Sequence, residues 1–481
     1  MAEMTIAPVA MHGSFVDGRW MEDGDLVEIR APYDGSLIAR VMQGRKEHAE
    51  AAIAAAVKAF GTTRRLPAFE RQRVLRRIAA AIADRKEEFS RTLTQEAGKP
   101  LKGARTEVER AIFTFNVAAE ESTRIYGEYL PLDWQEFTAG RWGIVRRFPL
   151  GPIAGITPFN FPLNLVAHKI APAIAAGCSM VLKPAPQTPL CSLLLAECVQ
   201  QAGWPDGGLN VLPLSNDDAG LLVTDDRIKL LSFTGSVAVG WEIKRRAGKK
   251  KVILELGGNA AVIVHGDADL AYAVDRCVTG GFAYAGQTCI SVQRILVEHA
   301  VYGRFVDLLV EGVKKLNVGD PLDETTDVGP LIRESDAART ILWIEEAVRA
   351  GARLLCGGSR QGLVVEPTVL TGTKPDMKVN CQEIFGPVVT VEPYKDFDQA
   401  VRQVNNSAYG MQAGVFTRDA KLLFQAYEEL EVGGVIAGDV PSFRIDHMPY
   451  GGVKDSGLGR EGLRYAIEEM TEPKLLVMNL R

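Results

Sequence analysis

The sequence predicts an α/β protein with two doubly wound domains and a small additional β element. Apolar segments of strand length alternate with helical segments from residue 150 onward, and a second cycle of the same kind starts after residue 256. Strands that alternate with helices form parallel sheets covered on both faces. The stretch 127–150 interrupts the pattern with aromatic side chains among Pro and Gly, which is typical of a two-stranded ribbon.

The chain before the ribbon predicts helices. Residues 46–60 are rich in alanine, and apolar side chains such as Val74, Ile78 and Ile82 recur at intervals of four. This spacing indicates amphipathic helices. The predicted helices are 46–60, 70–97 and 105–125.

The ribbon itself carries exposed aromatic side chains on either side of a turn at 138–140. They are Tyr129, Trp134, Phe137, Trp142 and Phe148. Exposed aromatic side chains on such a ribbon predict a binding surface for another protein chain. The alternative is that the hairpin packs on its own domain.

Short apolar runs locate the strands of both sheets. Predicted strands of the first sheet lie at 152–156, 180–183, 209–214, 229–233 and 252–256, with helices at 163–176, 192–202, 217–223 and 237–247. The second sheet is predicted at 261–264, 294–298, 364–370 and 388–394, with helices near 301–316 and 334–350. The tail predicts a helix at 462–470 and a strand at 474–478, which pairs with the ribbon or with another subunit. Ligands of such sheets bind beyond the carboxyl ends of the strands.

The composition is that of an ordinary globular protein. Of 481 residues, 47% are hydrophobic and 24% charged, so we expect two or three folded domains. The net charge of -5 provides no attraction for nucleic acid or an anionic membrane. No apolar run approaches the roughly 18 residues of a membrane span. The N-terminus lacks the basic start of a secretory signal.

The seven cysteines are scattered and form no CxxC pair. A disulfide framework and a structural zinc site are therefore not expected, and no metal is predicted. Free thiols are typical of the reducing cytoplasm, where we expect the protein to be.

Two segments carry candidate catalytic side chains. Cys289 ends GQTC at 286–289, after glycines that let the backbone approach a ligand closely. A deprotonated thiol attacks carbonyl carbons well. Glu255 closes an apolar strand before a Gly-Gly pair, which leaves room for a general base. The alternatives are a buried structural thiol and a charge that only solvates a strand end.

Two loops carry candidate binding groups. Asn160 stands between prolines in TPFNFP at 157–162, where its amide suits an oxyanion hole, although such an Asn also fits a plain turn. FTGSVAVG at 233–240 joins a strand to a helix whose first amides would meet phosphates. It is not GxGxxG, so the strict dinucleotide fingerprint is missing.

The order in which the motifs occur is far more specific than any single motif. The motifs in sequence order are Asn160 in PFNFP, Lys183 in KPAPQTP, Ser236 in FTGS, Glu255 in ELGGN, Cys289 in GQTC, Glu383 in EIFGP, PYGG at 449–452 and SGLGRE at 456–461. From about residue 14 to its end, the chain resembles the aldehyde dehydrogenase superfamily.

This resemblance implies oxidation of an aldehyde to a carboxylate with NAD or NADP. Cys289 would form a thiohemiacetal, with the oxyanion held by the amide of Asn160 and the backbone N–H of Cys289. Each donor of this kind typically contributes about 2.7–4 kcal/mol to lowering the barrier. Loss of hydride would leave a thioester, and Glu255 would activate the water that hydrolyses it.

The resemblance also implies a variant Rossmann cofactor domain, which explains the missing GxGxxG. Its cofactor contacts carry over to Thr157, Phe159, Lys183, Gly235, Ser236, Glu383 and Phe385. Lys183 would bond the adenosine ribose and Glu383 the nicotinamide ribose. Pro186 stands where NAD-preferring members often have a glutamate. Nothing there repels a 2′-phosphate, but proline adds no contact, so NAD and NADP both stay open.

Substrate contacts are implied at positions that flank the reacting centre, namely Phe161, Thr288 and Ile290. Arg105 and Arg444 are candidates for binding an anionic group, or else they form structural salt bridges. The segment 446–472 resembles the branch that handles small hydroxy, phosphono or sulfo aldehydes, or succinate semialdehyde.

The resemblance implies a division of the chain and an assembly. The predicted parts are an NAD(P)-binding domain at 1–126 and 150–255, a catalytic domain at 256–454, and an oligomerisation ribbon and tail at 127–149 and 455–481. The expected assembly is a homodimer or homotetramer, with no nucleic-acid or membrane partner.

Two other functions remain as alternatives. A CoA-acylating semialdehyde dehydrogenase would pass the acyl group to CoA, but members of that branch usually lack the glutamate that is Glu255 here. A catalytically silent scaffold protein would tend to lose the cysteine or the cofactor contacts, which this chain retains.

Overall fold

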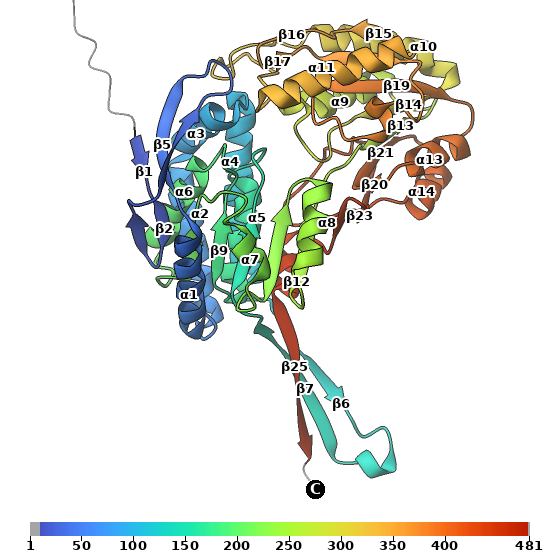
Figure 1. The fold of residues 1–481 in the computed structure, drawn as a ribbon. Helices are drawn as coiled ribbons and strands as arrows, with labels where there is room; N and C mark the ends of the chain where they lie inside the picture. The colour runs from blue at the N-terminus through green and yellow to red at the C-terminus, as the bar shows by residue number, and fades with distance from the viewer. Residues whose placement is uncertain (1–9, 480–481) are drawn as a thin grey trace, which may run out of the picture.

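The protein consists of two helix-covered sheets and a slender arm that projects from them (Figure 1). The structure is a computed structural model that describes residues 10–479. No helix in this range is long and apolar enough to cross a membrane.

The first sheet has a parallel centre with antiparallel strands at its edges. In spatial order its strands are β24 (Gly457–Leu458), β12 (Lys251–Glu255), β11 (Leu230–Thr234), β8 (Ile153–Ile156), β9 (Met180–Lys183), β10 (Leu209–Val211), β2 (Ser14–Val16) and β3 (Arg19–Met21). Its central strands are buried on both faces, as their unbroken apolar runs require.

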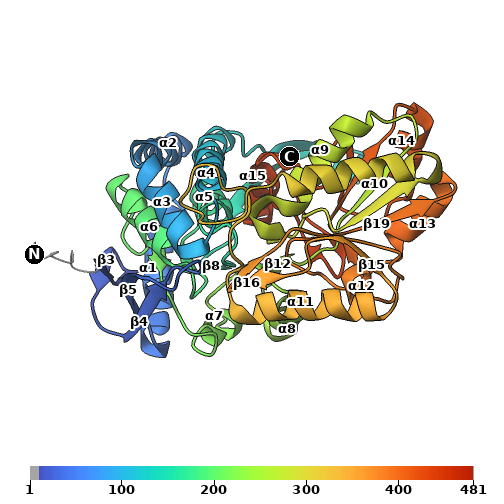
Figure 2. The same cartoon turned by 90° about the horizontal axis from the view of Figure 1, so that it is seen from above.

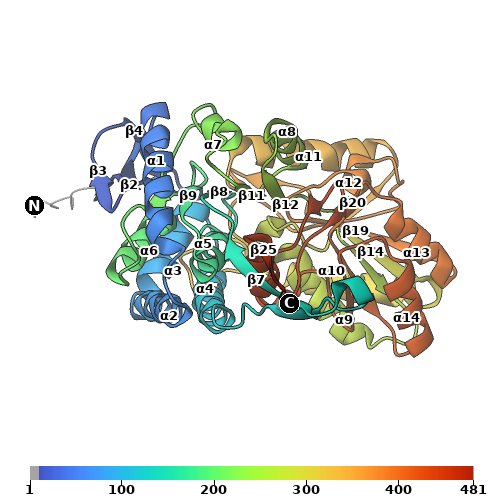
Figure 3. The same cartoon turned by 90° about the horizontal axis from the view of Figure 1, so that it is seen from below.

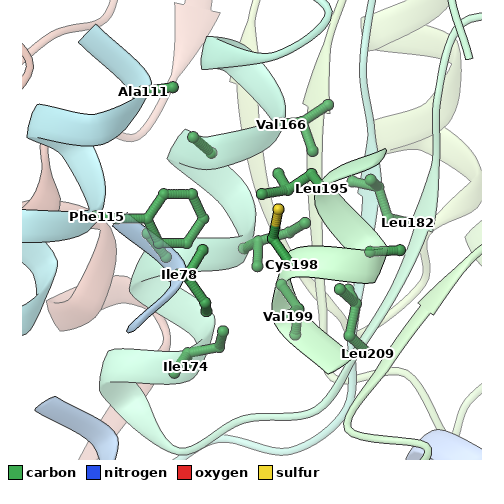
Figure 4. Close-up of a cluster of buried hydrophobic side chains, with 14 of the residues drawn as sticks. Ile78, Ala111, Phe115, Val166, Ile174, Leu182, Leu195, Cys198, Val199 and Leu209 are labelled. Carbon is green, nitrogen blue, oxygen red and sulfur yellow. The ribbon is translucent and has the colours of Figure 1, made fainter. Parts of the chain in front are cut away.

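Helices cover both faces of this sheet. One face carries α2 (Ala68–Asp84), α3 (Lys86–Ala97), α4 (Leu101–Glu121), α5 (Asn164–Ala176), α6 (Leu190–Gln201) and α15 (Leu463–Glu469). The other carries α1 (Lys46–Thr63), α7 (Gly220–Thr224) and α8 (Val237–Arg246). Side chains such as Phe115, Val166 and Leu195 interlock in the first of these layers (Figure 4).

The second sheet is parallel except for its β15–β18 edge. In spatial order its strands are β15 (Arg353–Cys356), β18 (Thr368–Thr371), β19 (Val388–Tyr394), β14 (Arg294–Glu298), β13 (Ala261–Val264), β21 (Gln412–Phe416) and β22 (Gly434–Ala437). One face carries α9 (Leu270–Phe282) and α10 (His299–Lys314), and the other α11 (Glu334–Arg349), α12 (Lys378–Cys381), α13 (Phe397–Asn405) and α14 (Ala420–Glu429). Figure 2 shows α10 and α11 on opposite sides of the strands.

The arm is a three-stranded antiparallel sheet of β6 (Glu128–Pro131), β7 (Arg141–Pro149) and β25 (Thr471–Asn479), with a short 3₁₀ turn at Glu136–Thr138. β25 pairs with β7 from Thr471 opposite Pro149 to Asn479 opposite Arg141. Figure 3, the view from below, shows β7 and β25 in front of the body. The predicted ribbon is confirmed, and the C-terminal strand pairs with the ribbon of its own chain.

Small sheets complete the fold. They are β1 (Ala10–His12) with β5 (Leu37–Gln43) and β4 (Asp25–Arg30), β16 (Arg360–Gln361) with β17 (Val364–Val365), and β20 (Tyr409–Gly410) with β23 (Val453–Lys454).

The predicted α/β class is confirmed, and several strands begin and end where predicted, namely 180–183, 261–264, 294–298 and 388–394. Two predictions were wrong in detail. The run 70–97 is two helices, because Arg85 leaves helical geometry (φ -108, ψ 21). The strand 364–370 is divided between β17 and β18. The N-terminal strands and α9, α13, α14, β21 and β22 were not predicted. The predicted bounds of the domains stay a prediction.

Candidate active site

The first sheet brings four of the predicted motifs to one edge. Ile156 at the end of β8 lies in register with Lys183 of β9 and Phe233 of β11, and Thr234 lies opposite Glu255. Because these strands are parallel, the loop after β8, the end of β9, the start of α8 and Glu255 share the carboxyl edge of the sheet.

The loop that carries Cys289 meets this edge from the second sheet. After α9 the chain turns through Tyr284 and Ala285, whose φ angles of 51° and 52° are left-handed for residues other than glycine. Such residues typically cost about 1–3 kcal/mol each and cluster at functional sites. Gly286 continues the turn at φ 70°, and a Cβ there would lie 2.2 Å from the carbonyl oxygen of Gly386. The GQTC loop therefore packs directly on the EIFGP loop.

Cys289 is partly buried beside an aromatic hydroxyl. Its Sγ lies 2.8 Å from the Tyr450 hydroxyl oxygen, and it packs against a buried cluster of Ile290, Met411 and Tyr450. Burial raises the pKa of the Cys289 thiol to about 12, although Tyr450 and the Arg444 charge lower it. At neutral pH the thiol is protonated in this state, so nucleophilic attack requires that the proton be removed as the reaction begins.

Asn160 reaches across from the first sheet to the cysteine loop. Its Nδ2 donates to the carbonyl oxygen of Gln287 at 3.0 Å. Two buried oxygens beside this contact, Asn160 Oδ1 and Thr288 Oγ1, have no hydrogen-bond partner among the described residues. The structure thus joins the predicted oxyanion-hole amide to the loop of the predicted nucleophile.

Glu255 is 2% exposed, and neither carboxylate oxygen has a partner among the described residues. Burial raises the pKa of Glu255 well above the usual value, and the nearby Glu461 charge raises it further. A Cβ at Gly451 would lie 2.9 Å from Glu255 Oε1, so glycine keeps space beside the carboxylate. An unpaired carboxyl with a raised pKa and room beside it has a high proton affinity once ionised, which is the property that a general base needs.

A buried ion cluster lies next to this carboxyl. Lys169 of α5 donates to Ser232, Thr234 and Glu461, and Arg444 donates to Glu461 at 3.0 Å. These cations hold the pKa of Glu461 at about 2. The Arg444 guanidinium carbon also lies 3.7 Å from the centroid of the Tyr450 ring, which links the cluster to Cys289.

The predicted cofactor contacts fit a dinucleotide by their chemistry. Lys183 is 4% exposed, donates to Asn216 at 3.2 Å, and has its pKa lowered to about 8 by burial. Thr157 Oγ1 is buried with no partner within residues 10–479. Both are polar groups that a ribose hydroxyl would satisfy. Ser236 is the N-cap of α8, with Gly235 before it, and the first amides of that helix favour phosphate.

Glu383 and Phe385 lie on the opposite side, in the EIFGP loop. Glu383 accepts from the Gly258 N–H at 3.0 Å, and burial raises its pKa to about 7. A Cβ at Gly257 would lie 2.2 Å from this carboxylate, so the ELGG glycines admit it. Phe385 (φ 50°) meets the ring of Phe159 edge-on at 5.9 Å. The first-sheet and second-sheet contacts therefore face each other.

The arginines predicted as substrate contacts lie in different settings. Arg444 has a side chain only 7% exposed and belongs to the cluster beside Tyr450. Arg105 instead makes a surface salt bridge with Glu87 and Glu324. That setting fits the structural alternative given for Arg105, because both of its partners are exposed carboxylates.

Sequence reasoning missed several charged side chains near the site. Arg110 lies 5.9 Å from the centroid of the Phe161 ring and donates to the buried Asp446. Lys99 lies 3.7 Å from the same centroid. Only Lys169 had a signal in the sequence, because a lysine inside an otherwise apolar helix requires a buried partner.

No group of His, Cys, Asp or Glu side chains within the described range is placed to hold a metal ion. All seven cysteines are free thiols.

Comparison with known proteins agrees with this arrangement. The profile of the Aldehyde dehydrogenase family matches residues 20–476. The 3-sulfolactaldehyde dehydrogenase of Priestia megaterium is 44% identical over 477 residues, which cover 99% of this chain and 100% of that protein.

Solved structures share the whole fold. Aldehyde dehydrogenase 21 from Physcomitrella patens, in complex with its reaction product succinate, is 46% identical with a TM-score of 0.97 over 98% of this chain and 99% of that one. The glyceraldehyde-3-phosphate dehydrogenase GapN from Methanocaldococcus jannaschii, complexed with NADP, is 40% identical with a TM-score of 0.92 over 95% of this chain and 100% of that one. Other structures of this fold hold NAD. The chain therefore belongs to the aldehyde dehydrogenase family and is an oxidoreductase that oxidises an aldehyde with NAD or NADP.

Proposed function

We propose that Cys289, Asn160 and Glu255 carry out this oxidation by a covalent route. The Cys289 thiol loses its proton to solvent water as its sulfur attacks the aldehyde carbon, and the amide of Asn160 and the Cys289 N–H stabilise the oxyanion. NAD or NADP, when bound, would supply the acceptor for the hydride, whose loss would leave a thioester on Cys289. Glu255 then takes a proton from water, which displaces the sulfur and releases the carboxylate. The proposal is supported by the contact of Asn160 with the GQTC loop and by the unpaired, buried carboxyl of Glu255.

The same proposal places the cofactor between the carboxyl ends of the first sheet's strands and the EIFGP loop of the second domain. Thr157, Phe159, Lys183, Gly235 and Ser236 would bind it from the first sheet. Glu383 and Phe385 would bind its nicotinamide half from the second. The buried Thr157 Oγ1, which has no partner among the described residues, the buried side chain of Lys183 and the Glu383 carboxyl, whose pKa is raised by burial, support these assignments.

We further propose that the aldehyde carries an anionic group. One observation carries this: the buried Arg444 guanidinium lies 3.7 Å from the ring of Tyr450, whose hydroxyl contacts Cys289. Arg444 donates to the buried Glu461 carboxylate, which Lys169 also contacts, and its guanidinium stays charged in this buried setting. Arg444 Nε is buried without a partner among the described side chains and is free to donate.

Some similar proteins are named for, or hold, an anionic compound: sulfolactaldehyde, glyceraldehyde 3-phosphate and the product succinate. Others are named lactaldehyde dehydrogenases, after a neutral aldehyde, so the proposal depends on Arg444 itself. Phe161, Thr288 and Ile290 would line the short space between this group and Cys289. We do not assign a substrate contact to Arg105, since Glu87 and Glu324 already occupy its guanidinium.

A matched pair of aldehydes tests the proposal. Succinate semialdehyde and butanal have the same carbon number and differ by the carboxylate. We expect Arg444→Gln to lower kcat/KM for succinate semialdehyde about 10- to 100-fold, because a charge-assisted hydrogen bond contributes about 1.5–3 kcal/mol. The value for butanal should change little. Arg105→Gln is the control and should alter neither. Equal losses for both aldehydes in Arg444→Gln would show that Arg444 is structural.

We also propose that the arm joins copies of this chain into a dimer or tetramer. Its aromatic side chains are exposed, with Tyr129 at 67%, Trp134 at 85% and Phe137 at 70%, and so are Leu475 and Leu476 of β25. An apolar surface of this kind marks a protein interface. The seven free thiols support a reducing compartment, and we propose the cytoplasm.

A further inference from the structure

A buried ion pair lies behind the contact between the two loops of the site. Lys99, between α3 and α4, has a side chain 2% exposed and pairs with Glu107 of α4, whose side chain is fully buried. Removing two charges from water is costly, and an apolar pair of similar volume often serves stability as well or better. Stability alone therefore does not account for this ion pair, and the contacts of its two side chains indicate a further role.

Glu107 holds the end of the Asn160 loop. Its Oε1 accepts from the N–H groups of Leu163 and Asn164 at 3.0 and 3.1 Å. These are amides at the start of α5, which have no partner within the helix. The carboxylate therefore fixes the point at which the TPFNFP loop becomes α5.

Lys99 contacts both loops at once. Its ammonium lies 3.7 Å from the centroid of the Phe161 ring and 4.6 Å from that of Tyr284. The two rings meet edge-on at 6.4 Å. Phe161 follows Asn160 directly, and Tyr284 begins the left-handed turn that leads to Cys289. A desolvated cation on two ring faces attracts both of them.

The backbone completes the connection. The Tyr284 hydroxyl donates to the Ala97 carbonyl oxygen at 2.8 Å, which ties the turn to the segment that carries Lys99. The Tyr284 carbonyl oxygen in turn accepts from the Gln287 N–H at 3.1 Å. The Gln287 carbonyl oxygen is the acceptor for Asn160 Nδ2. The position of Tyr284 therefore affects every contact in this series, from Ala97 to Asn160.

We propose that Lys99 and Glu107 are positioning residues that set the distance between the Asn160 amide and Cys289. The inference rests on the proposed function, in which Asn160 and the Cys289 N–H hold the oxyanion. Neither residue contacts the reacting atoms; the ion pair acts by holding Phe161 and Tyr284 together. The alternative is an ion pair that contributes only to stability.

The test separates a step that needs the oxyanion hole from one that needs the thiol alone. The first is the rate of cofactor reduction in the first turnover with succinate semialdehyde. The second is alkylation of Cys289 by iodoacetamide, followed by mass spectrometry. Lys99→Met keeps the side-chain length and removes the charge. Lys102→Met, three residues further along in an exposed pair with Asp327, is the control.

We expect Lys99→Met to slow the first turnover about tenfold or more, since small misplacements of catalytic groups are costly. Alkylation should stay within about twofold of the wild type. In an Asn160→Ala background, adding Lys99→Met should slow the first turnover by less than about threefold, because the two residues act on one interaction. Lys102→Met should change neither rate.

Other outcomes overturn the inference in distinguishable ways. If Asn160→Ala leaves the first turnover unchanged, the proposed role of Asn160 is wrong and the inference falls with it. If Asn160→Ala slows the turnover but Lys99→Met does not, or if the two losses multiply, only the inference is wrong. Should Lys99→Met not fold, the double variant Lys99→Met/Glu107→Gln leaves no unpaired charge, and the same rates decide.

Discussion

At the scale of single residues, burial raises the proton affinity of two carboxyl groups and one thiol of the site. Cys289, Glu255 and Glu383 each have a pKa above the ordinary value, whereas Glu461 between two cations has a lowered one. Opposite shifts within one cluster are the usual sign that its groups have different roles. Glu461 stays ionised and fixes the cations, while Glu255 remains able to exchange a proton.

Glu255→Gln is expected to separate the two halves of the reaction. Reduction of the cofactor should still occur once per site, because formation of the thioester needs the deprotonated Cys289 and the oxyanion hole but not the base that activates water for hydrolysis. Steady turnover should fall about 10²- to 10⁴-fold without the general base. Rapid mixing with measurement of the reduced cofactor distinguishes the two rates. A variant that turns over normally would exclude Glu255 as the base.

The pH profile of the same step has a definite direction. Glu255 acts as a base only when ionised, so the hydrolysis rate should rise with pH. Because the pKa of Glu255 is raised, the midpoint of that rise should lie above the usual glutamate pKa of about 4.3.

Release of the thioester by added CoA instead of water would favour the CoA-acylating alternative.

At the scale of elements, one buried carboxylate connects two helices to the loop that carries Arg444. Asp446 accepts from Arg110 of α4 and from Asn164 and His168 of α5. These donors hold the pKa of Asp446 well below its usual range despite burial. Its contribution to stability is therefore present above the unfolded-state pKa and is lost as the pH falls.

Asp446→Asn should lower the stability of the fold by about 3 kcal/mol, because breaking a buried pair leaves a charge uncompensated. The loss should shrink as the pH falls below the unfolded-state pKa, because the unfolded wild-type carboxyl then binds a proton that the folded one does not. Urea unfolding at neutral and acid pH measures both effects. Glu242→Gln, which breaks the exposed i,i+3 pair with Arg245, should leave the midpoint unchanged. A midpoint unaffected by Asp446→Asn would mean that other contacts hold the loop.

At the scale of the whole molecule, the arm leaves apolar strands in solvent that the body does not cover (Figure 1). Leu476 of β25 is 56% exposed, and we expect Leu476→Lys to lower the mass of the assembly in analytical ultracentrifugation by weakening an apolar contact. Val57→Lys on α1, where the valine is 41% exposed, is the control and should leave the mass unchanged. An unchanged mass in Leu476→Lys would argue against the proposed role of the arm.

The predictable part of the fold is the part that local patterns encode. The strands at 180–183 and 261–264 were found because a strand buried on both faces is an unbroken apolar run. The short N-terminal strands lacked such a signal. The helix α9 was not predicted although it has an Asp269 N-cap and buried side chains at helical spacing. Arg85 ends a helix inside a sequence with uninterrupted helical spacing. Its guanidinium bonds Glu88 and Glu197, and the second of these lies far along the chain, where local spacing carries no information about it.

The sequence by itself determined the class of the fold, the order of the motifs and the identity of the reactive groups. Those depend on residue types and spacing, which the chain carries in linear form. The tertiary structure decided which charges act together. The sequence does not distinguish the roles of Arg105 and Arg444. In the structure, Arg105 bonds exposed carboxylates and Arg444 is stacked on Tyr450. Lys99 likewise stands far from Phe161 and Tyr284 in the chain, and only folding, which sets burial and distance, brings its charge between their rings.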